Sequence, residues 1–161
     1  MSSTIGLGVP VPKMLPVTGA WTLPFTAYLL LLSNRVVYQR IKNKQWIGDH
    51  LNNPDNKNHT TGNSDNPDPL FLESRCHLNF LENVPLAFVF AAIAELNGAD
   101  RSVLSYAMAA LFALRVGHVE IGLRGKGTMA NGRPIGMFGT QGFLAGMAAY
   151  TAYLVKGYWG Y

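Results

Sequence analysis

Apolar residues dominate four stretches of the chain, which are separated by polar or glycine-rich connections. This pattern predicts helices at about 16–41, 70–97, 101–123 and 134–156. No charged side chain occurs in 17–32 or in 135–155. Each of these runs approaches the ~20 residues that cross a ~30 Å hydrocarbon core. We therefore predict one all-α domain over 1–161, an integral membrane four-helix bundle with up-down order.

The connections between these stretches indicate how the predicted helices are arranged. The segment 43–69 is rich in Asn, Asp, Pro and Gly and cannot bury enough apolar surface to fold alone. A short connection at Gly98 joins the second and third helices, so we expect an antiparallel hairpin. Gly139, Gly142 and Gly146 share one face of the fourth helix, and such stripes let membrane helices approach closely.

Charge changes this picture by suggesting an orientation. Charged residues make up only 14% of the chain, against about 25% in an average soluble domain. The basic residues sit mostly at the ends of apolar runs, so we expect membrane lipids and no nucleic acid as partners. On the positive-inside rule, the connections after helices one and three are cytosolic and both termini are lumenal or outside. Seven basic residues on one side outnumber three on the other: Arg40, Lys42, Lys44, Lys57, Arg124, Lys126 and Arg133 against Lys13, Arg101 and Lys156.

The single cysteine, Cys76, excludes an internal disulfide and a cysteine-based metal cluster. We interpret it as a small apolar residue packed in a helix rather than a reactive thiol. His77 and His118 have no convergent third ligand, so no metal site is predicted. His77 and Glu73 share a face and are interpreted as a solvated pair near the helix end.

Polar residues in the second and third helices are the candidates for chemistry. At 100° per residue, Arg75, Asn79 and Glu82 fall within about 60° of one another on one face. Arg115 and His118 share a face of the third helix. These five side chains supply cations, a carboxylate and an amide within largely apolar segments.

A charge at bilayer depth costs about 2.5–3.5 kcal/mol, so such groups persist only with partners or water. The sequence therefore predicts that Glu82 pairs with Arg75 or Arg115 and that a polar pocket opens toward the cytosolic side. Glu120 is predicted to point away from this face. The alternative is that these groups only hold helices together, at about 0.6 kcal/mol per interhelical pair.

The stretch 75–85, which reads Arg-Cys-His-Leu-Asn-Phe-Leu-Glu-Asn-Val-Pro, resembles the signature of the MAPEG family. These are membrane-associated proteins in eicosanoid and glutathione metabolism. Further segments similar to the family lie at 95–98, 114–118 and 132–137. The resemblance covers 70 to about 154 well and the first helix by position only. It is closest to the short branch found in bacteria and fungi.

The resemblance implies a homotrimer that binds glutathione as co-substrate between neighbouring chains, near the cytosolic face. It further implies a glutathione transferase or peroxidase acting on lipophilic electrophiles, in the endoplasmic reticulum or another intracellular membrane (the inner membrane in a bacterium). Arg133, which begins helix four, matches an arginine that assists the thiol. Five residues match those that bind glutathione: Arg75, Asn79, Glu82, Arg115 and His118.

Four positions depart from the pattern of the better-understood enzymes. Leu78 stands where an arginine often precedes the asparagine, and Gly122 replaces a tyrosine one turn beyond the histidine. Pro134 replaces a hydroxyl residue, and Met137 replaces a second tyrosine. A second hypothesis is therefore a non-catalytic membrane scaffold, or a lipid- or thiol-binding protein, with the same fold.

Overall fold

The computed structural model describes residues 4–5, 9–10, 14–49, 68–124 and 132–160. In these residues, β1 (Thr4–Ile5) pairs antiparallel with β2 (Val9–Pro10), ahead of four long helices. The helices are α1 (Pro16–Lys42), α2 (Pro69–Leu96), α3 (Arg101–Gly117) and α4 (Gly132–Leu154). The π-helix η1 (His118–Leu123) continues α3, and the 3₁₀-helix η2 (Lys156–Trp159) follows α4. The predicted all-helical fold with four long helices is confirmed.

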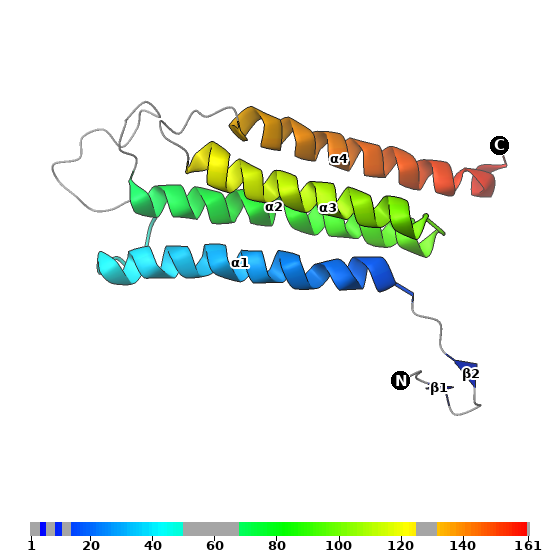
Figure 1. The fold of residues 1–161 in the computed structure, drawn as a ribbon, viewed down its shortest axis with the longest axis horizontal. Coiled ribbons are helices and arrows are strands. Elements are labelled where there is room, and N and C mark those ends of the chain that lie inside the picture. The colour runs from blue at the N-terminus through cyan, green and yellow to red at the C-terminus, as the bar shows by residue number, and fades with distance from the viewer. Residues whose placement is uncertain (1–3, 6–8, 11–13, 50–67, 125–131, 161) are drawn as a thin grey trace.

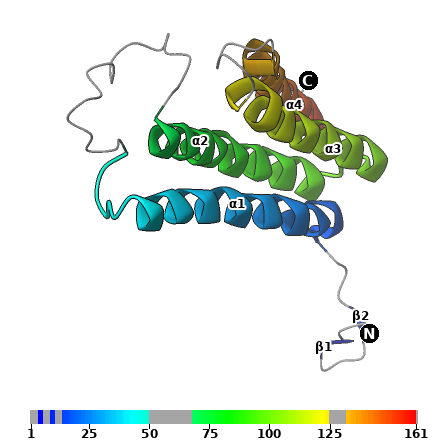
Figure 2. The ribbon, with the colours of Figure 1, turned by 60° about the vertical axis from the view of Figure 1, so that its left-hand side comes forward.

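Successive helices run in opposite directions, which is the predicted up-down order (Figure 1). The beginning of α1 therefore lies at the same end of the bundle as the end of α4. Both views place α2 and α3 between α1 and α4 (Figures 1 and 2). Within the described residues α2 packs against every other long helix, whereas α1 and α4 do not touch. The central position of α2 matters because it carries three of the six residues of the predicted site.

Local signals set the ends of the helices. Asp68 accepts hydrogen bonds from the backbone of Leu70 (2.8 Å) and caps the beginning of α2. Asp100 accepts from Ser102 N at 2.9 Å and caps α3 in the same way. These caps satisfy amides that have no partner within the helix. Gly98, at φ +83°, supplies the left-handed residue that ends α2 and allows the short turn into α3.

Two stripes with the same spacing run along opposite faces of α2. The inward stripe forms much of the core: Glu73, Cys76, Phe80, Val84, Ala87, Ala91 and Ala94. The outer stripe is exposed on the single chain: Arg75, Leu78, Glu82, Leu86, Val89, Ile93 and Leu96. An apolar stripe left uncovered on a central helix needs lipid or another chain to cover it.

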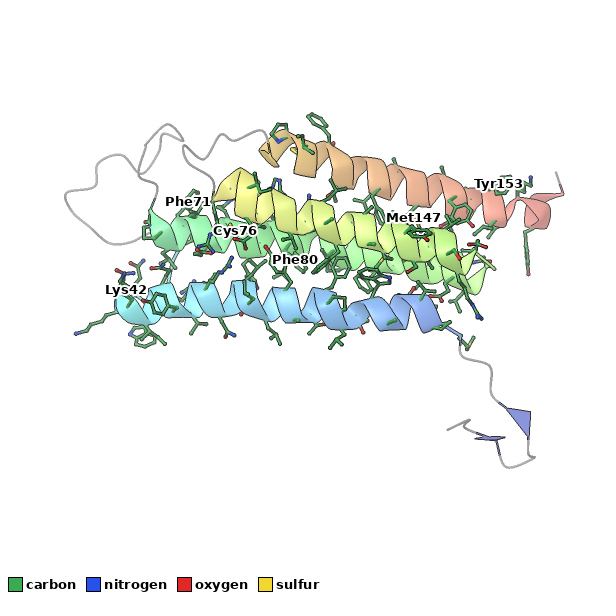
Figure 3. The ribbon with its side chains drawn as sticks, viewed as in Figure 1. Lys42, Phe71, Cys76, Phe80, Met147 and Tyr153 are labelled. Atoms are coloured by element: carbon green, nitrogen blue, oxygen red, sulfur yellow. The ribbon has the colours of Figure 1, made fainter. Side chains whose placement is uncertain are left out.

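Aromatic side chains fill the centre of the bundle between α1, α2 and α3. The ring of Phe25 lies 5.0 Å from that of Phe88 and 5.1 Å from that of Phe112. Phe80 joins this cluster between α1 and α2, at 6.1 Å from Phe25 (Figure 3). Each such pair contributes about 0.5–1.5 kcal/mol beyond its buried area. The cluster fixes α1 against α2 and so positions the polar residues nearer the loop end.

Two segments are long and apolar enough to cross a membrane, Pro69–Leu96 and Arg101–Leu123. The prediction of four such helices is thus supported for α2 and for α3 with η1. Although its first part carries no charge, α1 contains threonines and a proline that lower its hydropathy, and α4 contains several glycines with the same effect. Uncharged polar residues and glycines therefore make α1 and α4 less apolar than α2 and the segment formed by α3 and η1.

Glycines of α4 bring this helix close to α3 and η1, but not along the whole predicted stripe. A Cβ on Gly136 would lie 2.3 Å from the Cβ of His118, and one on Gly139 would lie 2.8 Å from Leu114. A Cβ on Gly142 or Gly146 would meet nothing within 4 Å. The packing prediction is therefore right for Gly139 and wrong, within this chain, for Gly142 and Gly146, because α4 turns those positions outward.

Glu95, near the end of α2, caps the beginning of α1. One carboxylate oxygen accepts from Val17 N and the other from Thr18 N, both at 2.8 Å. These amides belong to the first turn of α1, where no backbone acceptor is available. A carboxylate at this position also interacts favourably with the helix dipole. Glu95 thereby fixes the spacing between the end of α2 and the beginning of α1.

Candidate functional site

Arg115 of α3 is the centre of the predicted site and is only 2% exposed. Its Nη1 donates to Asn79 Oδ1 of α2 at 2.9 Å, and its Nη2 donates to the carbonyl of Gly136 in α4. Its Nε is buried and has no hydrogen-bond partner among the described residues. No carboxylate in the described residues forms an ion pair with this guanidinium. Among the described residues, neutral oxygens alone therefore hold this buried cation.

The surrounding residues fix this arrangement, which we call the Arg115 cluster: Asn79, Arg115, His118 and Gly136. The carbonyl of Gly136 also accepts from Thr140 Oγ1 at 2.9 Å. His118 is 6% exposed and packs against Gly136, whose missing side chain leaves room for the imidazole. The cluster thus joins α2, α3, η1 and α4, and brings together three of the residues predicted from sequence.

Arg75 and Glu82 lie on the outer stripe of α2 and are exposed on the single chain. Asn79 is half-buried at the edge of that stripe, so it links the exposed groups to the Arg115 cluster. The predicted pairing of Glu82 with Arg75 or Arg115 is wrong for the described part of the chain. The rotation of α2 turns Asn79, rather than Glu82, toward α3. Glu82 and Arg75 therefore face away from the bundle and toward whatever covers α2.

Arg133 lies in the first turn of α4, as predicted, but its side chain is outside the described part of the structure. The same holds for most of the predicted polar connection at 43–69. The position of the Arg133 guanidinium relative to the Arg115 cluster therefore also lies outside the described structure. The role of Arg133 stays a prediction.

A second polar cluster, which was not predicted from the sequence, joins the later part of α1, the beginning of α2 and the end of η1. We call it the Glu120 network. Glu120 Oε1 accepts from Arg35 Nη1 at 2.6 Å and from Tyr28 Oη at 3.1 Å. Arg124 then bridges two carboxylates, with Nε 3.8 Å from Glu120 Oε2 and Nη1 3.4 Å from Glu73 Oε1. Glu120 does point away from Arg115, and it turns instead toward α1.

The signal for this network was present in the chain. Arg35 and Glu120 are charged residues inside largely apolar segments, and Arg124 follows Glu120 at i+4. Charges in such segments usually pair with one another across helices. The π-helical turn η1 shifts the register after Gly117, and single π-turns of this kind are frequent at functional sites.

A cavity of about 630 Å³ lies beside the Glu120 network, between α1 and the ends of α2 and η1. It is lined by Ala27, Leu30, Leu31, Asn34, Arg35, Tyr38, Gln39, Glu73 and Arg124. None of the five predicted site residues whose side chains the structure describes lines this cavity. The interpretation of His77 and Glu73 as a solvated pair also fails for Glu73, which is buried and contacts Arg124 instead.

The chemistry available differs between the two clusters. The Arg115 cluster holds a buried N–H donor that has no partner among the described residues, and Asn79 links it to an exposed cation and an exposed carboxylate on α2. Such a set suits a ligand bearing both negative and positive groups. Among the described residues no group of three metal-ligating side chains comes together. Cys76 is fully buried in the core, as its interpretation as a packed residue requires.

Comparison with known proteins places the whole bundle in one family. A sequence model of the MAPEG family matches residues 18–153, from the first turn of α1 to the end of α4. No curated protein and no solved structure matches the chain. MAPEG proteins are membrane proteins that act generally in glutathione and eicosanoid metabolism. Because the match covers nearly the whole chain and includes the Arg115 cluster, the chain belongs to the MAPEG family.

Proposed function

We propose that this chain is a glutathione-binding membrane protein that acts as a transferase or peroxidase on lipophilic electrophiles. The observation that carries the proposal is the hydrogen bond between Asn79 and Arg115. This bond connects a buried cation, which has no carboxylate partner among the described residues, to the exposed polar residues of α2. Membership of the MAPEG family makes glutathione the first ligand to consider.

The charges of glutathione complement these residues. Glutathione carries two carboxylates, one ammonium and one thiol, so a binding site needs cations, a carboxylate and amide partners. Arg75 and Arg115 are the cations, Glu82 accepts the ammonium, and Asn79 and His118 supply neutral hydrogen bonds. A buried charge without a partner costs several kcal/mol, and a ligand carboxylate near Arg115 would offset much of that cost.

A second copy of the chain completes this site in the proposal. The outer stripe of α2 is apolar except for Arg75 and Glu82, which is the composition of a helix interface with a polar site inside it. We propose that three copies pack through these stripes as a homotrimer. Glutathione would then lie between neighbouring chains, with the rest of the surface against lipid.

The proposed reaction begins with the thiol of glutathione. A thiol of pKa about 8.5 is mostly protonated at neutral pH, and a nearby guanidinium or helix N-terminus favours the thiolate. Arg133 lies in the first turn of α4 and would combine both effects. The thiolate attacks an electrophilic carbon, a carbon–sulfur bond forms, and a leaving group such as halide departs with its electron pair. We place all four helices in the membrane, with the Arg115 end cytosolic and both termini lumenal or outside.

Conjugation of a chlorinated dinitrobenzene by the purified protein tests the proposal, in detergent and in liposomes. We expect a glutathione-dependent rate above background and a melting temperature that rises with glutathione concentration. Arg75→Gln and Glu82→Gln should abolish both effects. Arg101→Gln, an exposed arginine at the opposite end of the bundle, should change neither. A protein that neither binds glutathione nor forms conjugates would remove the proposal.

The second candidate is a non-catalytic MAPEG protein that binds a thiol or a lipid. Two tyrosine hydroxyls of the better-understood enzymes are missing, because Gly122 and Met137 replace those tyrosines. Gly122 is buried in η1, and Met137 is exposed on α4. Saturable glutathione binding without turnover would favour this candidate. Introducing Gly122→Tyr or Met137→Tyr and gaining turnover would show which missing hydroxyl matters.

A further inference from the structure

The cavity beside the Glu120 network has one apolar wall and one polar end. Ala27, Leu30 and Leu31 form the apolar wall along α1, whereas Arg35 and Arg124 lie at the polar end. From Ala27 to Gln39 this groove follows α1 for about 18 Å, at 1.5 Å per residue. That length exceeds half of a ~30 Å hydrocarbon core, the depth of one leaflet. The groove has the dimensions of a single acyl chain with a headgroup at the loop end.

The two arginines at the polar end have donors to spare. Arg35 directs Nη1 at Glu120, so its Nη2 and Nε make no hydrogen bond within the described residues. Arg124 contacts its carboxylates through Nη1 and Nε, which leaves Nη2. Both side chains remain about one-third exposed, at 29% and 34%. A phosphate at the mouth of the cavity can therefore accept hydrogen bonds from both without breaking the network.

Glu73 supplies the complementary charge. Its side chain is 8% exposed and lines the same cavity. Its Oε1 faces Arg124, but its Oε2 has no hydrogen-bond partner among the described residues. A buried carboxylate oxygen is rarely left without a donor. Because Oε2 is covered, a small rotation of the Glu73 side chain would be needed to expose it, after which a donor group in the cavity, such as a primary ammonium, would satisfy this oxygen.

We propose that this groove binds a membrane phospholipid whose headgroup carries a primary ammonium, of the phosphatidylethanolamine type. The phosphate lies between Arg35 and Arg124, the ammonium reaches the Glu73 carboxylate, and one acyl chain follows the apolar wall of α1. The network itself is balanced, with two arginines against two glutamates, so it matches a zwitterionic headgroup better than an anionic one.

This groove is separate from the proposed glutathione site. It lies between α1 and the ends of α2 and η1, whereas the Arg115 cluster joins α2, α3, η1 and α4, and the two share no described residue. The proposal requires a membrane location, which the family indicates, but it does not require glutathione binding or turnover. Either can fail while the other holds.

A headgroup series tests the proposal on the unchanged protein. Lipids with identical acyl chains are added to the purified protein in detergent, and bound lipid is counted by native mass spectrometry. We expect phosphatidylethanolamine to bind at least about tenfold more tightly than phosphatidylcholine, because the quaternary ammonium has no N–H to donate. Lipids that carry one or two N-methyl groups should bind with intermediate affinity, and each added methyl group should weaken binding further. Equal binding of all headgroups, or a preference for phosphatidylglycerol, would overturn the proposal.

A pair of isosteric variants places the lipid in this groove. Glu73→Gln should reduce the preference for phosphatidylethanolamine over phosphatidylcholine to about twofold or less and leave glutathione binding intact. Glu82→Gln, an exposed glutamate on the opposite face of α2, should keep the lipid preference and lose glutathione binding. A lipid preference unaffected by Glu73→Gln would show that the headgroup binds elsewhere and reject the site.

Discussion

Replacing Gly136 by alanine tests whether the close approach of α4 to η1 holds the Arg115 cluster together. The added Cβ would lie 2.3 Å from the Cβ of His118 and 2.7 Å from its Cγ and Nδ1. The Cβ of His118 is bonded to the backbone, so no side-chain rotation can relieve the shortest contact. The helix α4 must therefore move away from η1. That movement also withdraws the Gly136 carbonyl from Arg115.

The size of the effect follows from two opposing contributions. Overpacking a tight interface typically costs about 1–3 kcal/mol, and a forced backbone shift belongs at the upper end. Alanine in a helix interior recovers up to about 1 kcal/mol relative to glycine. We expect a net loss of about 2 kcal/mol. For a chain of this size that loss corresponds to a melting temperature about 4–8 °C lower.

The assay is thermal unfolding of the purified protein in detergent, with glutathione binding measured in parallel. Gly146→Ala is the matched control, because it makes the same change in the same helix and its Cβ would meet nothing within 4 Å. The control should be unchanged or slightly more stable. If the two variants behave alike, the contact between α4 and η1 does not determine stability, and the reasoning fails.

Three further predictions test other contacts. Glu95→Gln should lower stability by about 0.5–2 kcal/mol because it weakens the cap on α1, and proteolysis of α1 should accelerate. Glu82→Gln, its exposed counterpart, should leave stability unchanged, and equal losses would contradict the capping role. Glu120→Gln and Arg35→Gln should couple by about 0.2–1 kcal/mol in a double-mutant cycle of thermal unfolding, since both groups are partly exposed. Strict additivity of the two would argue against the ion pair. Arg115→Met should keep or raise the melting temperature, because it removes a buried charge that has no ionic partner in the described part of the chain. The same variant should abolish the rise in melting temperature that glutathione causes. If that rise were retained, Arg115 would be excluded from the site.

The helices were predictable because their signals are local. Proline begins two of the apolar runs, and Gly98 marks the turn between α2 and α3. The common face of Arg75, Asn79 and Glu82 also follows from helix periodicity alone. Membership of the family could be inferred from the order of polar residues within one apolar helix. None of these inferences requires knowledge of how one helix is rotated against another.

The partners of the charged residues were not predictable for that reason. Periodicity assigns residues to a face but does not say which neighbour the face meets. The sequence predicts that Glu82 pairs with Arg75 or Arg115, yet Arg115 is held by the neutral oxygens of Asn79 and Gly136. The pairing of Arg35 with Glu120 joins residues far apart in the chain and depends on the π-helical register of η1.

The cap that Glu95 provides for α1 has a consequence for biosynthesis. The first turn of α1 leaves the ribosome long before residue 95. Its backbone amides therefore lack the Glu95 acceptor while α2 is being synthesised. We therefore expect α1, which we propose to lie in the membrane, to be fixed against α2 only after Glu95 has been made. A nascent chain arrested before residue 95 should leave α1 loosely packed against α2, whereas one arrested after residue 95 has left the ribosome should hold α1 in place.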